Sequence, residues 1–149
     1  MRSEKWEVGS GKSFELIHLG GEKTVTGSCH LLRVNGVNIL VDCGLAQGGE
    51  RVAPMASWPV PPDKIDFLFL THAHIDHIGR LPELISGGFR GEIITTEATA
   101  FLLAPLLEDA LRLNCGLIGV MGLIGVRVKL FKKSLRLHEM LVNFLCWVE

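Results

Sequence analysis

The chain has 149 residues, of which 48% are hydrophobic and 21% charged, and its formal net charge is −1. A chain of this length has room for one domain with a substantial core, and the composition excludes an intrinsically disordered protein. The near-zero charge excludes a uniformly basic nucleic-acid-binding protein. A polyanion would therefore have to bind at a local patch or through bound cations.

The cysteines and the amino-terminal residues indicate the cellular compartment in which the protein is expected. Four cysteines form no CxxC pair and show no regular spacing: Cys29, Cys43, Cys115 and Cys146. The first twelve residues are charged and lack the apolar run of a signal peptide. We therefore predict reduced thiols and a cytoplasmic protein. The longest apolar stretch, 117–126, is interrupted by glycines and is too short to span a bilayer, so we expect no membrane partner.

The first half of the chain reads as strands. Residues 1–12 are predicted to be a polar lead-in, and 14–19 a first strand. Residues 30–34 and 37–41 are predicted to form a hairpin, because Asn35-Gly36 between them suits a type I′ turn with positive φ at both central positions. The hairpin ends at 42–44, and a loop rich in glycine and proline follows over 48–62.

The next part alternates between strands and helices. The continuous apolar run at 65–70 predicts a buried strand. A short helix is expected over 78–85, opened by Gly79 and stopped by Gly87-Gly88, followed by a strand over 92–95. A longer helix is expected over 96–113, with Thr95 or Thr96 as N-cap and a kink at Pro105. This alternation predicts an α/β layered domain.

The character of the sequence changes after residue 113. Residues 114–126 are apolar and glycine-punctuated without a clear period, and 127–136 hold five basic and no acidic residues. Such charge runs are more often solvated faces than RNA-binding sites. Apolar residues at helical spacing follow over 137–148. We therefore predict one unit over 1–113 and a divergent tail of unclear fold over 114–149.

The segment 71–77, Thr-His-Ala-His-Ile-Asp-His, predicts a metal-binding loop directly after a buried strand. His72 and His74 face the same way if the segment is extended, and can hold one ion together. A turn into the next helix can carry Asp76 and His77 to a neighbouring position. Imidazole and carboxylate suit zinc, with iron or manganese possible. Two such ions would share a hydroxide that is a nucleophile at neutral pH. A chance cluster of histidines is the weaker reading, because four potential ligands fall within six residues.

The run His-Ala-His-Ile-Asp-His resembles the HxHxDH signature of the metallo-β-lactamase superfamily. The stretches around it resemble the β-CASP branch, namely VTGSCHLL, LVDCGLAQG, THAHIDHIGRLPEL, GFRGEIITTEAT and LLEDALRL. That branch comprises zinc-dependent RNA nucleases related to pre-mRNA 3′-end cleavage factors, and this chain is most similar to its bacterial and archaeal members. The resemblance covers residues 14–113 and implies that 1–113 is the amino-terminal part of such a domain.

The resemblance implies a fold, a cofactor and a substrate. The fold is α/β, the amino-terminal half of a metallo-β-lactamase αββα sandwich and therefore incomplete. The cofactor is Zn²⁺, two ions per complete site, and RNA is the substrate. By the same resemblance His72 and His74 would bind one zinc, and Asp76 and His77 the other. Asp76 is also the candidate catalytic carboxylate, and Asp42 would support the loop without binding metal.

The family also has a third histidine, a bridging aspartate, a final histidine and an inserted domain, and none is recognisable here. Each zinc would have two protein ligands from this motif, whereas catalytic zinc normally has three. His138, on an apolar stripe, and His18 and His30, on predicted strands, are expected to be structural. We therefore expect a truncated, possibly inactive piece of a longer nuclease that exposes apolar surface and self-associates. Two alternatives stay open: another hydrolase of the superfamily, acting on a thioester, lactam or small phosphodiester, or a non-catalytic remnant or interaction module.

Overall fold

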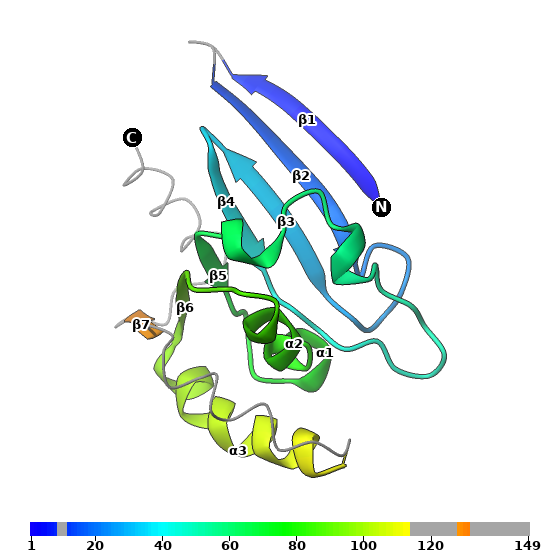
Figure 1. Ribbon diagram of the computed structural model, residues 1–149, viewed down its shortest axis with the longest axis vertical. Helices are drawn as coiled ribbons and strands as arrows, with labels where there is room; N and C mark the ends of the chain where they lie inside the picture. The colour runs from blue at the N-terminus through cyan, green and yellow to red at the C-terminus, as the bar shows by residue number, and fades with distance from the viewer. Residues whose placement is uncertain (9–11, 114–127, 132–149) are drawn as a thin grey trace.

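A mixed β-sheet organises the protein, and its strands lie side by side in chain order (Figure 1). The computed structural model describes residues 1–8, 12–113 and 128–131. Seven strands are present in this part: β1 Arg2–Val8, β2 Lys12–Gly20, β3 Cys29–Val34, β4 Val37–Val41, β5 Phe67–Phe69, β6 Glu92–Thr96 and β7 Val128–Phe131. Neighbours from β1 to β4 are antiparallel, and neighbours from β4 to β7 are parallel. The fold is therefore α/β, as predicted.

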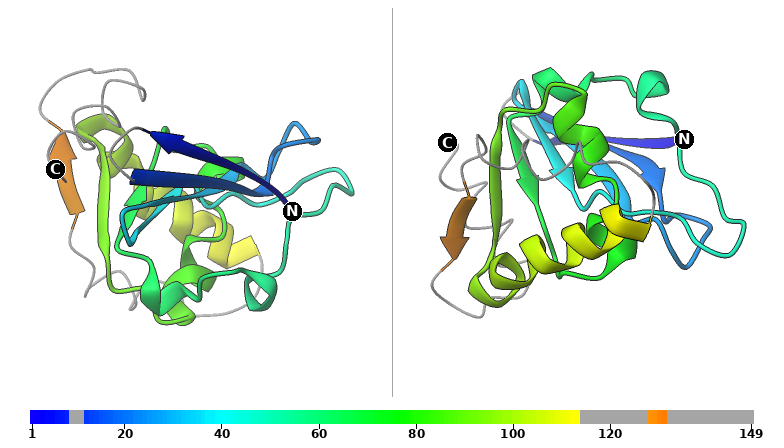
Figure 2. Two further views of the ribbon diagram at one scale, coloured as in Figure 1. Left: turned by 90° about the horizontal axis from the view of Figure 1, so that it is seen from above. Right: turned by 60° about the horizontal axis from the view of Figure 1, so that its bottom comes forward.

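The helices connect the parallel strands and gather on one side of the sheet (Figure 2). Helices α1 Ile75–Ile78 and α2 Leu81–Ser86 join β5 to β6, and α3 Glu97–Leu113 follows β6. Two 3₁₀ turns, η1 Met55–Ser57 and η2 Pro62–Lys64, lie in the loop before β5.

The core has two parts because successive strand residues point to opposite faces of the sheet. The larger cluster contains Leu40, Leu68 and Ile93 from the central strands, packed with Ile78 and Leu84 from the helices. The smaller cluster lies on the opposite face and consists of Ile39, Val41, Phe69 and Ile94. Both faces of the central strands are thus buried, which explains why the sequence around β5 is continuously apolar.

The predicted hairpin is confirmed. Val34 pairs with Val37 across a two-residue turn in which Asn35 has φ 49° and Gly36 has φ 84°. Both values are positive, as a type I′ turn requires. The predicted strand at 65–70 is also present, although the regular strand is limited to Phe67–Phe69.

The predicted polar lead-in is wrong, because β1 pairs with β2 along its whole length. Glu15 on β2 holds the two strands together: it accepts a hydrogen bond from Ser3 (2.8 Å) and forms ion pairs with Lys5 (3.3 Å) and Arg33 (3.1 Å). An edge strand with exposed faces needs few apolar residues, and charged side chains on it discourage further pairing. The sequence of β1 therefore lacks the alternation of apolar and polar residues by which a strand is recognised.

The single helix predicted over 78–85 is also wrong. Two helices are present, and Gly79, expected to open the helix, instead ends α1. A Cβ at Gly79 would lie 2.7 Å from the Cβ of Leu45, so the loop after β4 packs directly on this point of the chain. Helix α1 begins at Ile75, inside the predicted metal loop.

Helix α3 has one of the two predicted N-cap residues at its start. Thr96 is the cap, since its Oγ1 accepts a hydrogen bond from the backbone N–H of Thr99 (3.3 Å). Thr95 is buried instead, and its hydroxyl donates to the carbonyl of Leu70 (3.0 Å). Pro105 lies inside the helix.

Strand β7 adds to β6 in parallel, so part of the predicted tail extends the sheet. Residues 114–127 and 132–149 lie outside the described residues, as do His138 and the apolar stripe around it. The boundary at residue 113 therefore stays a prediction. Within the described part, no helix is both long and apolar enough to cross a bilayer.

Candidate functional site

The predicted site residues gather at the carboxyl ends of two parallel strands. Asp42 directly follows β4, and Thr71 follows β5 after one intervening residue. Ser28 precedes β3, which runs antiparallel to β4, so it reaches the same edge of the sheet. In open α/β sheets, ligands bind in the crevice outside the carboxyl ends of the strands. The topology thus brings the metal motif to the edge where a ligand is expected.

Asp42 connects three segments at this edge. Its side chain is only 2% exposed and accepts hydrogen bonds from the backbone N–H of Thr71 (2.9 Å), the hydroxyl of Ser28 (3.1 Å) and Nδ1 of His77 (2.7 Å). The Thr71 hydroxyl lies 3.0 Å from both carboxylate oxygens. The backbone of Asp42 has φ 57°, which few residues other than glycine, asparagine and aspartate adopt readily. This geometry suits the supporting position that the resemblance implies for Asp42.

The four predicted ligand side chains lie next to one another. The His72 ring is 4.6 Å from the His74 ring and 3.8 Å from the His77 ring, measured between centroids. Because Nδ1 of His77 faces Asp42, its Nε2 is the nitrogen left to bind a ligand, and it lies 3.6 Å from Oδ2 of Asp76. In the same way Nδ1 of His72 lies 2.9 Å from the Thr71 hydroxyl, which leaves Nε2. These side chains are part-exposed, and His74 is exposed.

Backbone hydrogen bonds fix the metal loop against the loop after β4. The N–H of Ser28 donates to the carbonyl of Asp76 (2.9 Å), and that of Cys43 donates to the carbonyl of His77 (2.7 Å). Gly44 lies between them, where a Cβ would be 1.6 Å from the Asp76 carbonyl oxygen. Only glycine permits this close approach. The absence of a side chain at Gly44 therefore allows the backbone of Asp76 and His77 to pack against the loop after β4.

Two buried cysteines lie beside the site. Cys29 and Cys43 are both fully buried free thiols. Burial raises the pKa of the Cys43 thiol well above its usual range, and a hydrogen bond with Cys29 raises it further. Because the thiolate is the form that binds zinc, this environment disfavours Cys43 as a ligand. The imidazoles and Asp76 are the donors that the motif itself supplies.

A metal ion fits the donor chemistry of the loop. Burial lowers the pKa of His72, and the neighbouring His77 and His74 lower it further, so this imidazole is neutral and free to bind an ion at neutral pH. Across residues 1–8, 12–113 and 128–131, however, no three histidine, cysteine, aspartate or glutamate side chains are placed to hold one ion. The predicted assignment of two ligands to each ion stays a prediction.

His30, for which we predicted a structural role, lies near the site, and its role stays a prediction. Its Nδ1 lies 2.9 Å from Nδ1 of His18. Burial lowers the pKa of His30 and His18 lowers it further, while the charge of Asp42 acts to raise it. His30 pairs with Val41, the residue before Asp42. The position of His30 beside this site could have been predicted from the sequence. Counting outward from the Asn35-Gly36 turn places His30 opposite Val41, next to Asp42.

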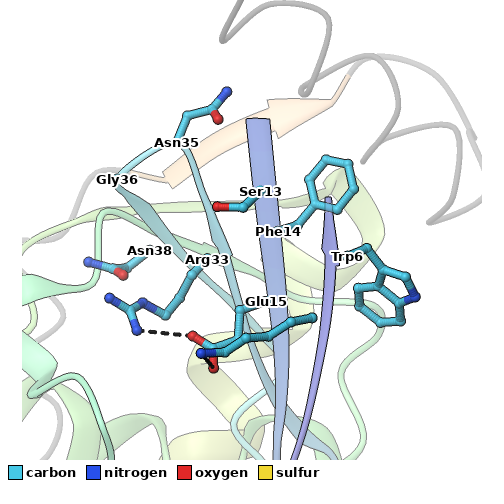
Figure 3. A pocket seen from close by; sticks show the side chains of 9 residues that line it. Trp6, Ser13, Phe14, Glu15, Arg33, Asn35, Gly36 and Asn38 are labelled. Carbon is cyan, nitrogen blue, oxygen red and sulfur yellow. Dashed lines mark hydrogen bonds and ion pairs between the residues drawn. The ribbon is translucent and has the colours of Figure 1, made fainter. Parts of the chain in front are cut away.

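A separate pocket of about 430 Å³ lies at the hairpin end of the sheet, away from the metal motif (Figure 3). Lys5 and Arg33 line it, and both form ion pairs with Glu15. Figure 3 shows Trp6 and Phe14 on the other side of the strands from Glu15 and Arg33. The aromatic and basic side chains therefore do not converge on one ligand.

Comparison with known proteins identifies related sequences. The model of the metallo-beta-lactamase superfamily matches residues 23–113. The chain is 44% identical over 97 residues to Ribonuclease TTHA0252 of Thermus thermophilus, covering 65% of this chain and 22% of that protein. It is 39% identical over 94 residues to Transcription termination factor FttA of Methanosarcina mazei, covering 61% and 15%. It is 34% identical over 99 residues to Cleavage and polyadenylation specificity factor 73 of Drosophila melanogaster, covering 64% and 14%.

A solved structure gives an independent view of the fold. The metallo-beta-lactamase fold protein YhfI of Bacillus subtilis superposes with a TM-score of 0.52 and 18% identity, covering 82% of this chain and 46% of YhfI. At this identity the likeness concerns the fold alone. It confirms the fold class predicted from the sequence, and the family match confirms the predicted resemblance. The chain belongs to the metallo-beta-lactamase superfamily.

Proposed function

We propose that the loop 71–77 forms part of a zinc centre that hydrolyses RNA phosphodiester bonds, as in the β-CASP branch. Membership of the superfamily implies metal ions. The matched relatives include a ribonuclease and a cleavage and polyadenylation factor. The chain spans 22% or less of the length of these relatives, so the activity concerns a protein of which these residues supply one part.

The hydrogen bond between Asp42 and His77 is the observation that carries the proposal. Histidines that bind metal commonly donate their other ring N–H to a carboxylate, which fixes the tautomer and raises the basicity of the ligating nitrogen. Asp42 accepts from Nδ1 of His77 at 2.7 Å and is itself held by Thr71 and Ser28. Nε2 of His77 is thereby directed toward Asp76. A solvated histidine with no ligand to bind would not need a buried carboxylate behind it.

Each residue of the loop then has a role. His72 and His74 would bind one ion and Asp76 and His77 the other, with further ligands from outside the motif, because catalytic zinc normally has three protein ligands. When bound, the ions supply a hydrolytic nucleophile at neutral pH and neutralise the phosphodiester. Asp76 would also orient the attacking water through its second carboxylate oxygen. The net charge of −1 is no obstacle, since the ions offset the charge of the RNA.

The test is hydrolysis by the purified chain loaded with zinc. The substrates are a labelled single-stranded RNA, a thioester and a β-lactam, and the variants are His72→Ala and His77→Ala with Lys64→Ala as a surface control. We expect zinc to bind in the wild type. Any hydrolysis by this part of the protein should act on RNA alone, should be abolished by a chelator and by both histidine variants, and should be unchanged in Lys64→Ala. Thioester or lactam hydrolysis without RNA cleavage would identify a different hydrolase of the superfamily. No hydrolysis, with less than one zinc bound per chain, would identify a non-catalytic module.

A further inference from the structure

We infer that a pocket beside the metal motif binds a second phosphate group of the RNA strand, away from the bond that is cut. The inference rests on the proposed function. The pocket measures about 220 Å³ and is formed by the loop after β2 and by residues near Arg51. The residues that matter for its chemistry are His18, Glu22, Lys23 and Arg51.

The charge of this pocket favours an anion. Lys23 and Arg51 are exposed, and neither forms an ion pair with any residue that the structure describes. Glu22 also lines the pocket; it lies 3.6 Å from Arg2, which forms a closer ion pair with Glu4 at 3.0 Å. Two cations, Lys23 and Arg51, thus line the pocket with one carboxylate, Glu22, so this lining has a net positive charge. This differs from the pocket at the hairpin end of the sheet, where Glu15 already binds both Lys5 and Arg33.

The loops that carry Lys23 and Arg51 are fixed to each other. Glu50 accepts hydrogen bonds from the backbone N–H groups of Val25 (3.1 Å) and Thr26 (2.9 Å), and from the Thr26 hydroxyl. These bonds lower the pKa of Glu50, which therefore stays ionised and keeps both loops in place. A Cβ at Gly20 would lie 2.3 Å from the carbonyl oxygen of Gly27, so the loop closes tightly at its base. A site held in this way loses little freedom when a ligand binds.

The pocket is close to the proposed zinc centre. His18 lies in it and contacts His30 at 2.9 Å, and His30 pairs with Val41 beside Asp42. His18, His30 and Val41 lie opposite one another on neighbouring strands, so two strand spacings of about 4.8 Å put His18, on the wall of the pocket, about 10 Å from Val41, the residue before Asp42. An RNA strand spans this distance within a few nucleotides.

The lining indicates a phosphate rather than a base. None of the described residues that line this pocket is a phenylalanine, tryptophan or tyrosine, whereas proteins that hold single-stranded bases stack them on aromatic side chains. Lysine and arginine are the usual partners of phosphate oxygens. Such an interaction adds affinity without base specificity.

The experiment compares two double variants of the full chain that each remove two cations. Lys23→Ala/Arg51→Ala changes the proposed phosphate site, and Lys5→Ala/Arg33→Ala changes the cation pair already bound by Glu15. The measurement is the affinity for a fluorescent single-stranded RNA in the presence of a chelator, over a range of salt concentrations, with folding checked by circular dichroism. For single strands the salt slope falls by about 0.7 for each phosphate that the protein no longer neutralises. We therefore expect a slope reduced by about 0.7 for the first variant, because it loses one phosphate contact, and an unchanged slope for the second.

Equal slopes in the wild type and Lys23→Ala/Arg51→Ala would overturn the inference, as would an equal reduction in both double variants. Because the chelator removes metal and the readout is binding, failure here is distinguishable from failure of the proposed hydrolysis. If RNA binds through Lys23 and Arg51 but the chain neither binds zinc nor cleaves RNA, the proposed function fails and the phosphate site stands. If RNA is cleaved and the slopes are equal, only the phosphate site fails.

Discussion

Oδ2 of Asp42 lies 2.7 Å from Nδ1 of His77, so a buried carboxylate directly after β4 orients an imidazole on α1, the helix that follows β5. The two residues are 35 positions apart in sequence and meet because β4 and β5 are parallel neighbours. Removal of this carboxylate should affect metal binding without removing a ligand.

Asp42→Asn tests that relationship directly. The amide keeps the shape of the carboxylate but loses its charge and accepts fewer hydrogen bonds, so it orients His77 less firmly. Loss of such a supporting partner costs about 10- to 100-fold in metal affinity. We expect this loss in a zinc titration by calorimetry. Because Asp42 also binds Thr71 and Ser28, stability should fall by about 1–3 kcal/mol. Unchanged zinc affinity in a folded variant would show that Asp42 has a purely structural role.

Gly44→Ala should disturb the packing between the two loops. Its Cβ would lie 1.6 Å from the Asp76 carbonyl oxygen, and backbone cannot yield as a flexible side chain does. We expect a loss of about 3 kcal/mol or more in urea unfolding. Gly48→Ala is the matched control: Gly48 has φ 60° but no atom within 4 Å of its Cβ, so only the backbone penalty of about 1 kcal/mol applies. Equal losses in the two variants would argue against a close approach at Gly44.

Acidification should destabilise the metal-free protein through His30. Its pKa is lowered in the folded state, by burial and then by His18, so the unfolded chain binds more protons once the pH falls below about 6.5. Stability is therefore complete above that pH and declines as the pH falls through it. The midpoint of urea unfolding should be lower at pH 5.5 than at pH 7.5. His30→Gln should reduce this difference, and the remainder should come from His72, whose pKa is also lowered. A pH dependence that His30→Gln leaves unchanged would contradict this explanation.

Apolar residues on α3 should promote self-association. Phe101 is 82% exposed and lies beside Leu102, which is 45% exposed, in a shallow hollow of about 500 Å³. Exposed apolar groups of this kind mark interfaces or aggregation-prone surfaces. We expect light scattering to show oligomers that diminish in Phe101→Gln at equal protein concentration. A wild-type chain that is monomeric throughout would refute this expectation.

Short sequence motifs predicted those parts of the structure that depend only on residues close together in the chain. The Asn35-Gly36 turn needs positive φ and specifies its hairpin by itself, and the ligand spacing from His72 to His77 is legible in the sequence. Strand β1 was missed because an exposed edge strand has no apolar alternation. The break at Gly79 was missed because packing against Leu45, 34 residues earlier, decides where α1 ends.

The surroundings of the site were predicted less completely for a similar reason. Asp42 was placed by resemblance, whereas its bonds to Ser28, Thr71 and His77 depend on which strands are neighbours. His30 was assigned a structural role, since strand position alone does not show that it lies beside Asp42. The cationic pocket with Lys23 and Arg51 requires two loops to meet, and only the folded chain shows that they do.

Zinc binding by the full chain, measured by calorimetry and by metal analysis after dialysis, tests the central claim most directly. The wild type should bind at least one zinc per chain. His72→Ala and His77→Ala should each lose about tenfold or more in affinity, since even indirect partners of a metal contribute this much, and Lys64→Ala should match the wild type. Zinc binding that is absent from the wild type, or equal in all four proteins, would show that the loop 71–77 does not bind metal.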